Sequence, residues 1–232
     1  MPNTIKQPVA ADMTPTDALN FLKAGNVRFL NDLRQHRDPY DDLKSRANEQ
    51  KPFASVVACM DSRVSTEMVF DIGIGDMFSL RIAGNILTQG IIGSLEFGAG
   101  VVGTKLIVVL GHTNCGAIKA ACDRVSLGNL TSLLEQIHPA VGLVQGVPEP
   151  HDSSNPEFVS AACHFNVRLA VEQLPHRSPI LRGLVEEGKL AIVAAMYDVA
   201  TGKVRFLEEP SEEEFSRVAQ IAASETPMLK TV

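Results

Sequence analysis

The sequence predicts an α/β fold, with a central, mostly parallel β-sheet flanked by helices, an N-terminal helical arm and an antiparallel edge strand. Three observations predict it. Short β-branched runs alternate with helical patterns, which is typical of a parallel sheet covered on both faces. A Thr201-Gly202 turn separates the last two strand-like runs and indicates a hairpin at a sheet edge. The 232 residues, 45% of them hydrophobic, suffice for one sizeable domain.

The N-terminal arm is expected because a helix start stands near the beginning of the chain. Thr14 can cap a helix, Pro15 fits its first turn, and Asp17 favours its N-terminus. An apolar stripe, interrupted by Gly25, then follows at helical spacing, and it comprises Ala18, Phe21, Leu22, Phe29, Leu30 and Leu33. We expect a single domain, residues 1–232, in which the arm covers 1–35, the core 50–208, and a C-terminal helix or tail 209–232.

Strands and helices are expected to alternate within the core. Strands are expected over 53–58, 77–81, 105–110, 190–197 and 204–207. Helices are expected near 65–71, 90–102, 114–126, 156–174 and 179–187. Residues 130–147 also have a helical pattern, which Pro139 should kink or end. The proline-containing stretch 147–156 is typical of a surface loop.

Two thiols and one imidazole follow two of these expected strands. Cys59 comes directly after 53–58, and His112 and Cys115 come after 105–110. Ligands bind outside the carboxyl ends of parallel strands, so these distant residues should meet in one crevice. Two thiolates and an imidazole can supply three ligands to Zn²⁺ and leave a fourth position for water, as in catalytic zinc sites. Such a water ionises near neutral pH and attacks small electrophiles.

His112 and Cys115 stand three residues apart where a helix is expected to begin. Residues at this spacing share one helix face and can share a metal. A helix N-terminus also stabilises a thiolate. The other two cysteines are expected to pack in the interior, because Cys122 lies about two turns further along the same expected helix and Cys163 falls in an alanine-rich helical stretch.

Three segments resemble, in order, the signatures of the β-class carbonic anhydrases. They are Cys-x-Asp-x-Arg at 59–63, Arg-x-Ala-Gly-Asn at 81–85 and Gly-His-x-x-Cys-Gly at 111–116. The resemblance spans about residues 15–208 and implies that Cys59, His112 and Cys115 bind one Zn²⁺ per subunit. It also implies a pair of Asp61 and Arg63 beside the metal. In open members of that family the aspartate accepts a hydrogen bond from the zinc-bound water, and in closed members it is itself the fourth ligand. Both states remain open here.

The same resemblance implies a substrate pocket. Gln50 stands where plant-type members place a glutamine that reaches the substrate across a subunit interface. Phe78, Ala83 and Phe97 fall where that family lines an apolar CO₂ pocket, and Gly116 where a backbone amide meets the substrate. Phe97 replaces a common tyrosine, so a hydroxyl is lost while the pocket stays apolar. The chain contains no tryptophan, and family members with a second, inhibitory bicarbonate site use one there, so such regulation is not expected.

By resemblance, the expected function is reversible, zinc-dependent hydration of carbon dioxide to bicarbonate and a proton, by a homodimer or homotetramer. One alternative is a hydrolase of carbon disulfide or carbonyl sulfide on the same scaffold. Another is a non-catalytic, zinc-containing interaction module. The latter is less favoured because a closed structural site needs neither a water partner nor a substrate pocket.

Composition excludes several classes of protein. The formal net charge of −6 and the pI of about 5.5 argue against nucleic-acid and anionic-membrane partners. No apolar run approaches the roughly 18 residues of a membrane span, and the first residues do not resemble a secretory leader. Four cysteines without dense spacing fit a reducing compartment. We therefore expect a cytoplasmic location.

Overall fold

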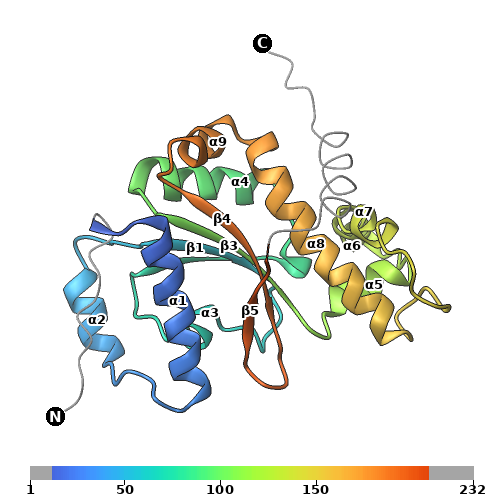
Figure 1. Cartoon of the computed structure of the whole chain (residues 1–232), viewed down its shortest axis with the longest axis horizontal. Coiled ribbons are helices and arrows are strands. Elements are labelled where there is room, and N and C mark those ends of the chain that lie inside the picture. Colours follow the sequence, from blue (N-terminus) through green and yellow to red (C-terminus); the bar gives the residue numbers. More distant parts are fainter. Residues whose placement is uncertain (1–11, 209–232) are drawn as a thin grey trace.

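The computed structural model describes residues 12–208, and within them the predicted α/β fold is confirmed (Figure 1). A five-stranded sheet has the order β2-β1-β3-β4-β5. Strands β1 to β4 are parallel, and β5 pairs with β4 in the antiparallel direction as the expected hairpin. The strands are β1 (Ala54–Ala58), β2 (Met77–Arg81), β3 (Leu106–His112), β4 (Ala191–Tyr197) and β5 (Val204–Phe206). The helix or tail expected over 209–232 lies outside the described residues.

Helices cover both faces of the sheet (Figure 1). On one side lie α1 (Pro15–Leu30), α2 (Pro39–Arg46) and α3 (Thr66–Val69). The other helical segments are η2 (Ala83–Asn85), α4 (Gln89–Glu96), the π-helix η3 (Phe97–Val102), α5 (Gly116–Cys122), α6 (Gly128–Glu135), α7 (His138–Gly142), α8 (Pro156–Arg177) and α9 (Pro179–Glu186). None of the helices in residues 12–208 is long and apolar enough to cross a membrane.

Strands β1 and β3 are buried along their whole length. Successive side chains of a strand point to opposite faces, so Val57 and Val109 join the cluster beneath α4, α5 and α8. Val56 and Val108 join the cluster beneath α1 and α3. Burial on both faces explains why β1 and β3 read as continuous apolar runs rather than as alternating ones.

The arm helix α1 packs on the core of its own chain. Thr14 and Asp17 form the expected capping box, which satisfies free amides at the helix start. A Cβ at Gly25 would lie 1.8 Å from the Phe70 carbonyl oxygen, so glycine permits this close approach. The helix ends at Leu30, and Leu33, which was expected in its apolar stripe, is 68% exposed.

One buried amide joins the arm to distant segments. The Asn26 Nδ2 donates to the carbonyl oxygens of Val69 and Gly202, each at 3.0 Å. Its Oδ1 accepts the Val204 backbone N–H at 2.9 Å. Asn26 thereby connects α1 with α3 and with the β4–β5 hairpin.

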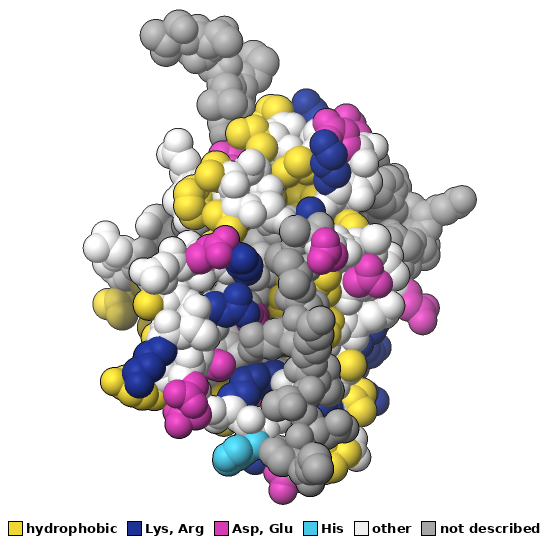
Figure 2. Space-filling model, turned by 90° about the vertical axis from the view of Figure 1, so that its left-hand side faces the viewer, with side chains coloured by type: hydrophobic (Ala, Val, Ile, Leu, Met, Phe, Trp, Pro, Cys, Tyr) yellow, Lys and Arg dark blue, Asp and Glu magenta, His cyan; other side chains and the backbone are white. Residues whose placement is uncertain are grey.

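Ion pairs also connect α1, α2 and the segment between them to buried aspartates of the core. Asp71 is buried and accepts from Arg28 at 2.5 Å and from Arg37 at 3.0 Å. Arg46 of α2 pairs with buried Asp76 at 2.6 Å. Figure 2 looks onto this side of the molecule and shows Lys and Arg side chains interspersed with Asp and Glu.

Several element boundaries differ from the sequence predictions. The pattern over 130–147 is divided into α6 and α7, and Pro139 stands in the first turn of α7 as expected for a helix break. The helix expected over 114–126 begins at Gly116 and ends at Cys122. Helix α2 was not predicted, because it buries none of its residues and so shows no apolar stripe.

Candidate metal centre

Three potential metal ligands meet at the carboxyl ends of β1 and β3. Ala58 pairs with Leu110 across these strands, so the residues that follow emerge at the same edge of the sheet. Cys59, His112 and Cys115 are all buried, and their ligand atoms lie within 4.8 Å of one another. The two Sγ atoms are 3.9 Å apart. Among residues 12–208 this is the only cluster of its kind.

A turn, rather than a helix face, brings His112 and Cys115 together. His112 is the last residue of β3, and Cys115 is the N-cap of α5. Between them Asn114 has a φ of 58°, a left-handed conformation that asparagine tolerates better than most residues. The expectation that both ligands lie on one helix was therefore wrong, although their proximity was correctly expected.

The imidazole of His112 is oriented for a metal. Its Nδ1 lies 3.0 Å from the Thr113 carbonyl oxygen, which can only accept, so Nδ1 carries the proton. The other nitrogen, Nε2, is then an acceptor, and it is buried without a hydrogen-bond partner. Leaving such an atom unpaired is costly, whereas metal-ligating histidines commonly have this arrangement. The donor set of two sulfurs and one imidazole nitrogen fits Zn²⁺.

The two thiols differ in acidity. The Cys59 Sγ accepts backbone N–H groups of Asp61 and Gly84, each at 3.4 Å. A hydrogen bond from Cys115 is the largest cause that lowers the pKa of Cys59 below its usual range. The same hydrogen bond, together with burial, raises the pKa of Cys115. Cys59 is thus prepared as a thiolate, the form that binds metal.

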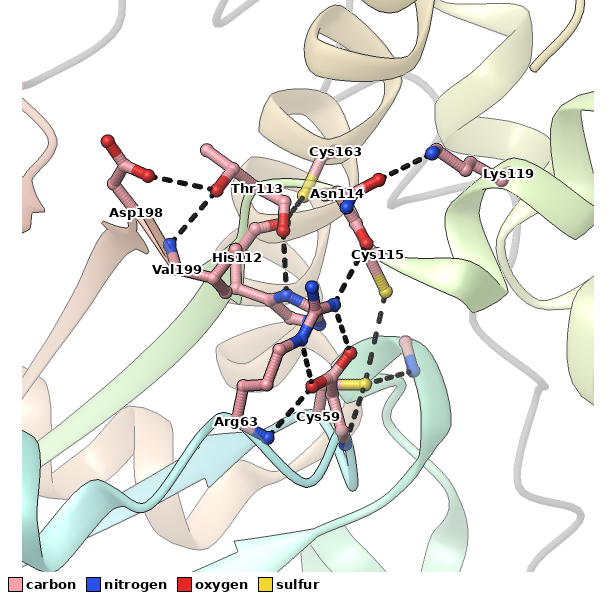
Figure 3. Close-up of polar contacts among 12 residues, drawn as sticks. Cys59, Arg63, His112, Thr113, Asn114, Cys115, Lys119, Cys163, Asp198 and Val199 are labelled. Atoms are coloured by element: carbon pink, nitrogen blue, oxygen red, sulfur yellow. Dashed lines mark hydrogen bonds and ion pairs between the residues drawn. The ribbon is translucent and has the colours of Figure 1, made fainter. Parts of the chain in front are cut away.

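Asp61 and Arg63 form the expected pair beside the cluster (Figure 3). Arg63 Nε donates to Asp61 Oδ1 at 2.9 Å and Nη2 donates to Oδ2 at 2.7 Å. The Arg63 backbone N–H adds a third contact at 3.0 Å. These hydrogen bonds hold the pKa of Asp61 well below its usual range. Arg63 Nη2 also donates to the Asn114 carbonyl at 3.3 Å, which ties the pair to the turn between the ligands.

The residues expected to bind substrate occupy less enclosed positions. Gln50 is exposed in the segment before β1, and Gly116 is exposed at the first residue of α5. Phe78 in β2 and Ala83 in η2 are partly buried, and Phe97 is 50% exposed. The structure brings the Phe78 and Phe97 rings to 6.4 Å between centroids. The roles of all five in substrate binding stay predictions.

Sequence reasoning missed several supports of the centre. Arg81 donates to the backbone carbonyls of Cys59 and Asp61, at 3.2 and 2.6 Å. Its place in the 81–85 motif was the available signal. From α8, the Asn166 amide donates to the Gly84 carbonyl at 2.9 Å, and the Cys163 thiol donates to the His112 carbonyl at 3.3 Å. Neither residue of α8 belongs to a motif that would have marked it.

Solved structures of β-carbonic anhydrases share this fold. The enzyme from Coccomyxa, solved in complex with acetazolamide, aligns with a TM-score of 0.65 and 23% identity over 92% of this chain and 97% of that one. The enzyme CafA of Aspergillus fumigatus aligns with a TM-score of 0.62 and 24% identity over 88% and 97%. At these identities the likeness establishes the fold class.

Sequence comparison establishes the family. The carbonic anhydrase family model matches residues 54–204. The chain is 35% identical over 211 residues to carbonic anhydrase 2 of Mycobacterium tuberculosis, covering 88% of this chain and 93% of that protein. It is 36% identical over 200 residues to a carbonic anhydrase of Mycolicibacterium smegmatis, covering 82% and 92%. The chain therefore belongs to the β-class carbonic anhydrases, which are carbonate dehydratases.

Proposed function

We propose that this chain catalyses the reversible hydration of carbon dioxide to bicarbonate and a proton at a Zn²⁺ held by Cys59, His112 and Cys115. The observation that carries the proposal is the buried cluster with its unpartnered His112 Nε2. Bound there, Zn²⁺ would supply the nucleophile by lowering the pKa of a coordinated water. Because two thiolates nearly cancel the charge of the metal, hydroxide should form towards mildly alkaline pH. Family membership supports the choice of carbon dioxide as substrate.

Asp61 has the role of orienting the attacking water. A carboxylate offers about four lone-pair positions, and Arg63 occupies three of them. One position remains to accept a hydrogen bond from the nucleophile. Because Arg63 keeps Asp61 ionised and turned towards itself, the geometry supports the open arrangement, in which water rather than Asp61 completes the coordination of the metal.

The five residues expected to bind substrate, called here the substrate wall, suit an apolar molecule; they are Gln50, Phe78, Ala83, Phe97 and Gly116. Phe78, Ala83 and Phe97 offer no charge that would favour a polar substrate over carbon dioxide, and the Gly116 amide can meet a developing negative charge. Gln50 and Phe97 are exposed in the single chain. We propose that a second copy covers them in a homodimer or homotetramer, as the plant-type resemblance implies, and that the assembly is cytoplasmic. Sedimentation analysis and cell fractionation test these two statements.

The decisive experiment combines elemental analysis with stopped-flow assays of carbon dioxide hydration at pH 8.5. The wild type should hold stoichiometric zinc and hydrate carbon dioxide. Cys115→Ala should lose both, because the metal is left with two protein ligands. Cys122→Ala is the matched control: this cysteine is buried in α5, the helix that Cys115 caps, but it lies outside the cluster, and its variant should keep both properties.

The remaining outcomes separate the alternatives. Zinc-loaded protein that hydrolyses carbonyl sulfide or carbon disulfide, but does not hydrate carbon dioxide, would be a hydrolase on this scaffold. Folded, zinc-loaded protein without any of these activities would contradict the proposal and favour an interaction module.

A further inference from the structure

A cavity of about 330 Å³ lies against two of the proposed metal ligands, on the side of α8. His112 and Cys115 contribute to its wall, together with Cys163 and Met196. Asp61 and Arg63 are absent from its lining, and so are the five residues expected to bind carbon dioxide. This cavity is therefore a different space from the expected substrate pocket.

The segment from His112 to Cys115 separates the two spaces. In Figure 3 the Cys163 side chain reaches this segment from one side, and the Arg63 side chain reaches it from the other. The contacts agree with that view, because Cys163 donates to the His112 carbonyl and Arg63 donates to the Asn114 carbonyl. A molecule in the cavity would therefore contact His112 and Cys115 on the side of α8, and it would not contact Asp61.

The inner wall of the cavity is apolar. Val159 and Cys163 from α8 and Met196 from β4 line it, and they are 5%, 3% and 7% exposed. The Cys163 thiol donates its hydrogen to the His112 carbonyl, and the Val159 and Met196 side chains have no ionisable group, so this wall is uncharged. An apolar body of a ligand would replace water here at little cost in lost hydrogen bonds.

The polar part of the lining has a positive charge and no carboxylate. Lys119 of α5 is the one lysine or arginine among the lining residues, which include no aspartate or glutamate. Its ammonium donates to the Asn114 side-chain oxygen, which holds it at the cavity. An ammonium has three donors, so two remain for a ligand. Ser153 and Ser160 add hydroxyl groups to the same lining.

From this lining we infer that the cavity binds a small organic monocarboxylate. The carboxylate pairs with Lys119, and the apolar body packs against Val159, Cys163 and Met196. The volume lies at the lower end of the range of about 300–1,000 Å³ for small-molecule sites, which suits a molecule the size of benzoate. An inorganic anion would satisfy Lys119 but would leave the apolar wall in contact with water.

Occupation of this cavity has a consequence for the metal centre, and this consequence rests on the proposed function. The ligand contacts His112 and Cys115 directly, and it also contacts the Cys163 thiol that holds the His112 carbonyl. A shift of either side chain changes the geometry around the metal. The cavity therefore makes the centre responsive to carboxylates that do not compete with carbon dioxide.

Calorimetric titration of the zinc-loaded protein with benzoate tests the site. One benzoate should bind per chain, and benzyl alcohol, which lacks the charge, should bind at least about tenfold more weakly, as expected for losing one charge-assisted hydrogen bond. Lys119→Met should weaken benzoate binding about ten- to hundredfold. Lys189→Met is the matched control, since Lys189 is exposed and pairs with Glu187, and it should leave binding unchanged.

Two further measurements locate the ligand. Azide, which is directed to the metal, should leave the benzoate stoichiometry unchanged when it is saturating, and Lys119→Met should bind azide like the wild type. In the cobalt-substituted protein, benzoate should shift the visible absorption of the metal in the presence of azide. Ser160→Trp fills the cavity from an exposed position on α8 and should abolish benzoate binding. This second variant tests the site if Lys119→Met does not fold.

Benzoate binding that is lost on adding azide and is insensitive to both variants would place the ligand on the metal and overturn the inference. Absence of benzoate binding to folded, zinc-loaded protein would overturn it as well. These outcomes are independent of carbon dioxide hydration, so a failure of the proposed function is recognised separately, by the activity assay.

Discussion

The metal centre is complete within a single chain, whereas the expected substrate wall is only partly enclosed by it. The three ligands are buried at the carboxyl ends of β1 and β3, and their supports come from β2, η2 and α8 of the same chain. By contrast, Gln50 is exposed and the Phe97 ring is half exposed. The difference indicates that the chemistry is built into each chain, whereas substrate recognition depends on a further surface.

The largest effect should follow from changing the carboxylate beside the metal centre. We expect Asp61→Asn to lower kcat/KM about 10²- to 10³-fold, the size seen when one preorganised hydrogen-bonding group is removed. The zinc content should stay unchanged, because Asp61 is not among the three ligands. Stopped-flow assays and elemental analysis check both statements. Asp32→Asn, a change of an exposed aspartate, is the control, and full activity in Asp61→Asn would remove this residue from the mechanism.

A subunit-mixing experiment tests whether the substrate wall is shared between chains. Gln50→Ala should lower kcat/KM about tenfold to a hundredfold, the value of a lost hydrogen bond to a polar or charged group. If Gln50 acts across a two-fold interface, a mixed dimer of Gln50→Ala and Asp61→Asn contains one intact site and one doubly defective site. Random reassociation should then restore roughly a quarter of the wild-type activity. Activity that stays at the average of the two variants would show that Gln50 serves its own chain.

A smaller effect is expected at the support that α8 gives to the metal centre. Asn166→Ala removes the donor to the Gly84 carbonyl, and it should cost about 1–3 kcal/mol of unfolding free energy, because a buried acceptor is left unsatisfied. Zinc should also dissociate faster, since Gly84 donates to the Cys59 sulfur. Denaturant unfolding and a chelator-competition assay measure the two effects. Asn129→Ala, at an exposed position of α6, should change neither.

The smallest change in chain stability is expected at Phe97. Its ring is half exposed and contacts Phe78, so Phe97→Ala should cost less than about 1.5 kcal/mol of unfolding free energy in the separated chain. The effect should instead fall on assembly and on KM. Sedimentation and steady-state kinetics would show this division. A large loss of chain stability with unchanged assembly would contradict the contrast between the two regions.

The sequence predicted most of the sheet and the composition of the metal centre. Strand β2 was expected at 77–81 and is found at Met77–Arg81, a short run that begins directly after the Gly73–Asp76 turn. The ligands were recognisable because Cys59 directly follows the β-branched run of β1, and His112 and Cys115 come shortly after the β-branched run of β3. The left-handed turn at Asn114 was not predicted, because a Gly-His-Thr-Asn sequence is compatible with either a turn or the start of a helix.

The supports from α8 could not be predicted for a different reason. Asn166 contacts a backbone group 82 residues away in the sequence, and Cys163 contacts one 51 residues away. Such contacts depend on how α8 crosses the end of the sheet, which local patterns do not specify. The same holds for the cavity beneath Lys119, whose wall combines α5, α8 and β4.

The hydrogen bonds of Asn26 have a consequence for the order of events during synthesis. The amide reaches Val204, 178 positions further along the chain, so α1, the first helix among residues 12–208, has no complete docking site until β5 has emerged from the ribosome. Contacts of such high sequence separation form slowly. The newly made arm therefore lacks its last contacts until β5 is made, and this interval is when a chaperone would have the most to shield.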